Sequence, residues 1–299
     1  MTSPIACDEL FKALNDNGEQ DAADGKEVYL GLAGLALKHV EWQSYSLKKM
    51  AVFKAKSAPL EDGEVRESGT TPAKTAIFVV VARIGSSGTF LAPDGNYRGA
   101  TGSLKKGFGD IMLSLGLEDP STHPDGVVFG PHWDTACSQI TQVMQLAAGT
   151  ESITSGAPEK KRITARHAVF EPLPENEHER QKIVESLAGK PSFFNIHNWP
   201  VNTEEAKAAL PTLFDTHTVT PLPAFDMDEQ IVDPVEYRSE LIGALALVSM
   251  RIVGWNIGET HRFRCEITNI DVLRGPVVEP AKRSVDVASE RSPSKRLKR

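Results

Sequence analysis

The sequence has few of the residues that mark secreted, metal-binding or membrane-spanning proteins. Its three cysteines, Cys7, Cys137 and Cys265, lie more than a hundred positions apart. This spacing argues against a disulfide framework or a cysteine-based zinc site, and it is typical of a reducing compartment. The longest largely apolar run, Leu241–Met250, is far shorter than the roughly 20 residues that cross a bilayer. The first twenty residues have neither the basic nor the apolar segment of a signal peptide, so we expect none.

The sequence also lacks the motifs of familiar enzyme classes. The glycine-rich stretch Gly99–Gly109 does not end in the Gly-Lys-Ser/Thr of a phosphate-binding loop. No serine, cysteine or histidine lies in a recognised nucleophile motif. We therefore expect a non-enzymatic protein without a cofactor.

The composition is that of a folded protein, with 40% hydrophobic and 24% charged residues. Long strand patterns separated by short helical patterns, with glycines inside the strands, favour an α+β fold over a doubly wound sheet. We predict an antiparallel, barrel-like β core, and the specific barrel that these features suggest is the OB type. The expected strands cover residues 28–40, 47–56, 74–84, 127–129, 162–170, 219–225, 241–255 and 262–273, and the expected helices 108–117, 134–148, 177–187, 203–210 and a turn from 234.

Charge divides the chain into unequal blocks within a formal net charge of −7. Residues 1–27 carry a net −5, which predicts an acidic, loosely ordered arm. Residues 28–280 are expected to form one globular domain, basic up to residue 110 and acidic after it. Residues 281–299 carry a net +5 with little apolar content, which predicts a disordered basic tail.

The tail resembles a two-part nuclear-import signal. Two basic clusters separated by eleven residues fit the acidic grooves of an import receptor, which is therefore an expected partner. Phosphorylation of Ser292, which precedes a proline between the clusters, would weaken that contact. The predicted import residues are Lys282, Arg283, Lys295, Arg296, Lys298 and Arg299.

A segment rich in lysine and aromatic residues indicates a nucleic-acid contact. Proteins that bind single strands combine aromatic rings for base stacking with cations for phosphates. The alternative is that Trp42 and Phe53 are core residues and the lysines face solvent. The predicted contacts are Lys38, Trp42, Tyr45, Lys48, Lys49, Lys54 and Lys56, extended by Arg83, Arg98, Lys105 and Lys106 near the glycine-rich stretch.

The sequence His132-Trp133-Asp134 raises an alternative, an iron(II) site of the two-histidine, one-carboxylate type. His197 or His217 would supply the third ligand, and Cys137, His123 and His167 lie nearby in the sequence. Asp134 also starts a predicted helix, where aspartate is a routine cap. The capping interpretation is favoured, and no metal is expected.

The region from residue 215 to 283 contains Pro221-Leu222-Pro223, Trp255-Asn256-Ile257 and Ile270-x-Val272-Leu273. It resembles a set of uncharacterised proteins from mushroom-forming (basidiomycete) fungi, some of them linked to mobile elements. The resemblance implies a eukaryotic, nuclear protein and brings no catalytic residues.

Together these features predict a nuclear, non-enzymatic protein that binds single-stranded DNA or RNA, with no membrane contact. Two alternatives remain open. One is a protein-interaction or structural component of a chromatin or mobile-element complex. The other is an iron(II)-dependent oxygenase.

Overall fold

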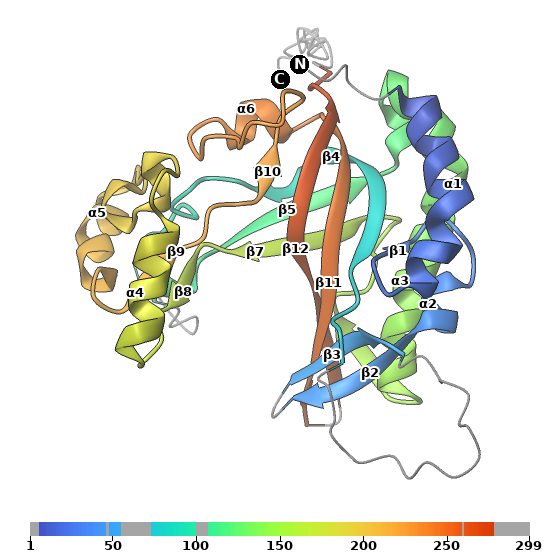
Figure 1. The fold of residues 1–299 in the computed structure, drawn as a ribbon, viewed down its shortest axis with the longest axis horizontal. Coiled ribbons are helices and arrows are strands. Elements are labelled where there is room, and N and C mark those ends of the chain that lie inside the picture. Colours follow the sequence, from blue (N-terminus) through green and yellow to red (C-terminus); the bar gives the residue numbers. More distant parts are fainter. Residues whose placement is uncertain (1–5, 46–47, 55–72, 100–106, 259, 278–299) are drawn as a thin grey trace, which may run out of the picture.

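The computed structural model describes residues 6–45, 48–54, 73–99, 107–258 and 260–277. The tail, Lys56, Lys105 and Lys106 lie outside these ranges. Within them, no helix is both long enough and apolar enough to cross a membrane. A long hairpin runs through the middle of the molecule, with helices on either side (Figure 1).

Ten strands form one large sheet. Its main path runs β1-β4-β5-β7-β12-β11-β3-β2, with β6 and β10 also paired to β12. The strands are β1 (Val28–Tyr29), β2 (Val40–Tyr45), β3 (Lys48–Phe53), β4 (Phe78–Phe90), β5 (Met112–Glu118), β6 (Ser152–Ser155), β7 (Ile163–Ala168), β10 (Ala224–Phe225), β11 (Leu245–Ile257) and β12 (Thr260–Arg274). A separate pair joins β8 (Phe170–Pro172) to β9 (His217–Val219).

The sheet corrects the expectation of an antiparallel barrel. β12 pairs in parallel with β6, β7 and β10, and β1 pairs in parallel with β4. The ten strands as a whole do not form a barrel, because β1 and β2 end the path. Parallel neighbours cannot be joined by a tight hairpin, and the segment between the two strands of each of these pairs contains further helices and strands. The fold is therefore a mixed α/β arrangement around a large sheet.

A closed circuit of pairings lies inside the sheet. β11, β4, β5 and β7 are neighbours in that order and all antiparallel, which is the spatial order of a Greek key. β12 pairs with β7 on one side and β11 on the other, so the pairings return to their start. This circuit brings the β11–β12 hairpin beside β7, although they are distant in the sequence.

Six α-helices are present among the described residues, and five of them form two groups, while α6 lies apart from both near β10 (Figure 1). α1, α2 and α3 lie on one side of the β11–β12 hairpin, and α4 and α5 lie on the other with β8 and β9. The helices are α1 (Cys7–Ala23), α2 (Leu35–His39), α3 (Gly130–Ala148), α4 (Glu177–Ser186), α5 (Glu204–Ala209) and α6 (Tyr237–Leu241). Short 3-10 turns are Phe108–Asp110, Pro120–Thr122, Pro124–Phe129, Ser192–Phe194, Ile196–Asn198 and Leu210–Leu213.

The main core lies between α3 and the inner face of the sheet. α3 buries Trp133, Ile140, Val143 and Met144, which recur at helical spacing. This confirms a helix at the predicted place, although it begins at Gly130 with Phe129 as its N-cap, so Asp134 lies inside the helix and does not cap it. Burying side chains of this size contributes about 1.5–3 kcal/mol each, so α3 is fixed firmly to the sheet.

The acidic arm expected over residues 1–27 is instead largely the regular helix α1. Leu14, Gly18 and Ala22, spaced by four, are buried. A side-chain carbon at Gly18 would lie 2.7 Å from the Leu32 Cδ1 methyl, so a larger residue there would require the Leu32 side chain to move. The apolar stripe is narrow among acidic neighbours, which is why composition alone suggested loose order.

β5 replaces the helix predicted over residues 108–117. Leu113, Leu115 and Leu117 are all fully buried, which is the period of two that a strand requires. The segment from residue 28 to 40 likewise differs from the single expected strand, since β1 ends at Tyr29 and α2 follows at Leu35.

A lobe with α4 and α5 is attached through the loop that follows β4. The buried Asp94 carboxylate accepts hydrogen bonds from the backbone N–H groups of Asn202 and Thr203, at 2.8 and 2.9 Å. The Trp199 indole N–H donates to the Pro93 carbonyl at 3.0 Å. Asn202 and Thr203 come directly before α5, so these hydrogen bonds fix the start of α5 to the loop after β4.

Candidate nucleic-acid interface

The β2–β3 hairpin divides the predicted nucleic-acid contacts between two faces. Tyr45 lies opposite Lys48, and Trp42 lies opposite Ala51. Opposed residues share a face, and successive residues along a strand alternate. Tyr45 and Lys48 are therefore together, whereas Trp42 and Lys49 lie on the other face.

Trp42 packs within the fold. Its indole N–H donates to the Val143 carbonyl of α3 at 2.8 Å, and its ring centroid lies 5.5 Å from that of Phe263 on β12. The side chain is half-buried. These contacts join the hairpin to α3 and β12, and they favour a structural role over base stacking.

The other predicted contacts do not gather in one groove. Lys38 forms an ion pair with Glu19, and the Lys54 ammonium donates to the backbone carbonyl of Leu37. Arg98 lies 3.9 Å from Glu205. Arg83 lines a separate hollow beside α6 with Glu118. The predictions for Lys56, Lys105, Lys106, Ser292 and the import residues of the tail fall outside the described residues.

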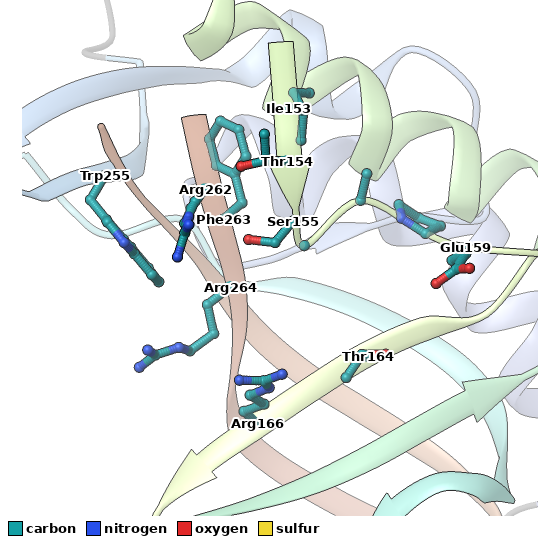
Figure 2. A pocket seen from close by; sticks show the side chains of 13 residues that line it. Ile153, Thr154, Ser155, Glu159, Thr164, Arg166, Trp255, Arg262, Phe263 and Arg264 are labelled. Atoms are coloured by element: carbon teal, nitrogen blue, oxygen red, sulfur yellow. The ribbon is translucent and has the colours of Figure 1, made fainter. Parts of the chain in front are cut away.

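A concave site lies where β11 ends and β12 begins, beside β6 and β7 (Figure 2). Its volume is about 700 Å³. We call it the arginine cleft and define it by Ser155, Glu159, Arg166, Trp255, Arg262 and Arg264, all of which line it.

Strand alternation places the arginines of β12 in the cleft. His261, Phe263 and Cys265 are buried, so Arg262 and Arg264 between them point outward. Trp255 on β11 lies directly opposite Arg262. The parallel pairing of β7 with β12 then adds Arg166, which lies beside Glu266.

The cleft is electropositive. Within the described part of the chain, the side chains of Arg166 and Arg262 take part in no ion pair or hydrogen bond, and both residues are exposed. Arg264 lies 3.3 Å from the Glu266 carboxylate and stacks over Trp255, with its guanidinium carbon 5.0 Å from the ring centroid. Glu159 is the one acid among the lining residues, and Arg264 is paired with Glu266 beside the cleft, so Arg166 and Arg262 supply its unpaired positive charge.

The residues proposed for an iron site have other partners. His132 Nδ1 lies 2.9 Å from the Tyr29 hydroxyl, and its ring stacks on Phe11. Asp134 forms an ion pair with Lys161 at 2.8 Å. Among the described residues, no group of three or more histidine, cysteine or acidic side chains is arranged to hold a metal.

Other residues named with that site are also placed. His123 accepts a hydrogen bond from the backbone N–H of Asp125, and Cys137 is buried on α3. His197 packs on Phe214, and His217 lies beside the Thr216 hydroxyl.

Histidine burial predicts a loss of stability in mild acid. Burial lowers the pKa of both His132 and His167 from the ordinary value of 6.5. The unfolded chain therefore takes up protons first as the pH falls, so stability is complete above about pH 6.5 and decreases below it. Urea unfolding between about pH 7.5 and 5 measures this loss.

His167→Gln is the variant that tests whether His167 contributes to this loss of stability. His167 Nε2 lies 2.8 Å from the Thr220 carbonyl, and a glutamine amide keeps a donor there without a titrating group. We expect the variant to lose less stability than the wild type over the same pH range. Identical pH profiles would show that His167 does not contribute.

The residues of the arginine cleft were missed by sequence reasoning, although one signal was present. The sequence Arg262-Phe263-Arg264-Cys265 alternates polar and apolar side chains, which places both arginines on one face of a strand. Trp255 and Arg166 carried no comparable signal, because their position depends on pairings between strands.

No protein-family model matches the chain, and no curated protein is similar enough to be counted as a relative. A function is therefore inferred from the geometry and charge of the cleft.

Proposed function

We propose that this protein binds single-stranded nucleic acid in the arginine cleft. One observation carries the proposal: Arg166 and Arg262 line the same cleft as the half-buried ring of Trp255. Neither arginine has a carboxylate partner in the described structure. Guanidinium groups bind phosphates in bidentate fashion, and an aromatic face stacks an unpaired base. Arg264 lies against the Trp255 ring and holds it in place.

The strand circuit supports the same proposal. OB folds are five-stranded Greek-key barrels that bind oligonucleotides on the face of their second and third strands and at the loop between the fourth and fifth. In the circuit of this chain, β7 is the third strand, and β11 and β12 are the fourth and fifth. Arg166 lies on β7, and Trp255 and Arg262 flank the β11–β12 turn. If the circuit corresponds to an OB barrel, as we propose, the cleft would occupy the place of its binding face.

The chain as a whole is acidic, yet the proposed ligand is a polyanion, and the local charge of the cleft reconciles the two. The net charge is −7, but affinity for a polyanion depends on the cations that reach its phosphates. The acidic surface elsewhere would limit unspecific binding. Nuclear import through the basic tail stays a separate prediction.

Charge reversal in the cleft tests the proposal. Arg166→Glu combined with Arg262→Glu should weaken binding of a fluorescent oligothymidylate at least about tenfold at low salt. Two lost phosphate contacts should also make the slope of log affinity against log salt shallower by about 1.4, at about 0.7 per contact. Fluorescence anisotropy across a salt series measures both quantities.

Arg238→Glu is the matched control. Arg238 is exposed on α6, directly before β11, and therefore lies at the opposite end of the hairpin from the cleft. The control should retain most of the affinity. Absence of salt-dependent binding by the wild type, or equal losses in both variants, would contradict the proposal and favour an interaction module.

A further inference from the structure

A second hollow opens on the lobe side of the sheet, and the proposed function assigns it no role. Its volume is about 800 Å³, and it lies between α4, β9, β10 and the strands β7 and β12. We call it the α4 groove and define it by Lys48, Ile183, Leu187, Lys190, Phe194 and Phe225.

The α4 groove is continuous with the arginine cleft. Arg166 and Arg264 line both hollows. They lie on β7 and β12, the two strands that separate Trp255 from the lobe. A chain that leaves Trp255 across these arginines therefore enters the α4 groove.

α4 leaves apolar side chains uncovered along this groove. None of its ten residues is buried, whereas α1 and α3 each bury several. Its start is nevertheless well formed, since the Asn176 side chain accepts from the backbone N–H of His178 at 2.9 Å. Ile183 and Leu187 face the groove half-buried, so α4 stands beside it without packing on the core.

Aromatic and cationic groups occur together in the groove. Phe194 comes from the lobe and Phe225 from β10, and both rings are half-buried. The Lys190 ammonium lies 5.0 Å from the centre of the Phe194 ring. Lys190 is exposed and has no carboxylate partner among the described residues.

The charge of the groove favours an anionic occupant. Its lining carries five cationic side chains, Lys48, Arg166, Lys190, Arg251 and Arg264, against the two carboxylates Glu171 and Glu266. Glu266 is already paired with Arg251 at 2.8 Å and with Arg264 at 3.3 Å. Half-buried rings beside cations that have no carboxylate partner, such as Lys190, form the combination that single-strand binders use for successive bases and phosphates.

We propose that the bound strand continues from the arginine cleft into the α4 groove, where Phe194 and Phe225 contact its bases and Lys190 and Lys48 its phosphates. This inference rests on the proposed function. It predicts a two-part site, in which the cleft binds the first nucleotides and the α4 groove adds affinity only for strands long enough to reach it.

The length of the oligonucleotide separates the two parts. Fluorescent oligothymidylates of about 4 and about 12 nucleotides both lie within the range of about 4–16 nucleotides that one OB fold occupies. The wild type should bind the longer strand at least about tenfold more tightly. Lys190→Glu should weaken binding of the longer strand about fivefold or more and leave the shorter strand nearly unchanged.

Two further variants sharpen the test. Lys182→Glu makes the same charge change on an exposed residue of α4 that does not line the groove, and it should affect neither length. Phe194→Ala should act like Lys190→Glu on the longer strand. Its fold is checked by circular dichroism, because Phe194 also stacks on Phe193.

The outcomes distinguish this inference from the proposed function. The wild type could bind both lengths with equal affinity, and both could lose binding in Arg166→Glu/Arg262→Glu. That result would overturn the role of the α4 groove and leave the proposed function standing. An equal effect of Lys182→Glu and Lys190→Glu would also overturn that role. No binding at either length would overturn both, and the groove would then fit an acidic peptide instead.

Discussion

Replacing Trp42 with alanine should lower the free energy of unfolding by about 3 kcal/mol, near the lower end of the range for large core aromatics. The substitution removes the hydrogen bond to the Val143 carbonyl and the packing on Phe263, and it leaves a gap between β2, α3 and β12. The half-buried state of the ring keeps the loss from being larger. Urea denaturation at neutral pH measures the change.

Trp255→Ala is the contrasting variant, because it removes the same side chain from the arginine cleft. Trp255 is half-buried as well, yet its described contact is the stacking of Arg264 at the surface. We expect about 1 kcal/mol or less of stability to be lost, together with about 1–3 kcal/mol of oligonucleotide affinity. If Trp42→Ala instead weakened binding without loss of stability, the stacking role first considered for Trp42 would be restored.

Local patterns in the sequence predicted those elements whose burial follows a clear period. The helix expected at 134–148 is present as the greater part of α3, and the strands expected at 241–255 and 262–273 are present as most of β11 and β12. The sequence predicts a helix in place of β5 because Gly116, a residue type that also ends helices, falls between Leu115 and Leu117. The burial of Leu113, Leu115 and Leu117 in the core determines the strand.

The candidate site could be predicted only in part. The pairing Tyr45↔Lys48 sets which lysines share a face with which aromatic ring, and composition cannot reveal this register. Of the eleven predicted contacts, Lys48 alone lines a groove together with the cleft residues Arg166 and Arg264 within the described part of the chain. The cleft itself joins β7 to β12, two strands about a hundred residues apart, and depends on tertiary pairing.

The architecture of the cleft depends on one glycine, and this gives the second large effect. Gly156 follows β6 and has a φ of +98°, a conformation that side chains rarely adopt. A β-carbon placed there would lie 2.3 Å from the Phe263 carbonyl oxygen on β12. The backbone of the β6 end is therefore packed directly against β12, between the two arginines that β12 contributes.

Gly156→Ala should lower the free energy of unfolding by about 3 kcal/mol. The left-handed conformation alone costs about 1–2 kcal/mol for a residue with a side chain. The clash with backbone adds about 1–3 kcal/mol, because a strand paired on both sides cannot move away without losing hydrogen bonds. If the chain relieves the clash by moving the β6 end, Arg262 moves with it, and oligonucleotide affinity falls at the same time.

Gly34→Ala separates the two causes. Gly34 has a comparable φ of +82°, but nothing lies within 4 Å of an added carbon, so only the conformational cost of about 1–2 kcal/mol remains. Thermal and urea unfolding of both variants measure the two losses in free energy of unfolding. The difference between these losses is the contribution of the contact with β12. Equal losses at the two positions would show that β6 does not press on β12, and the wall of the arginine cleft would have to be built by other contacts.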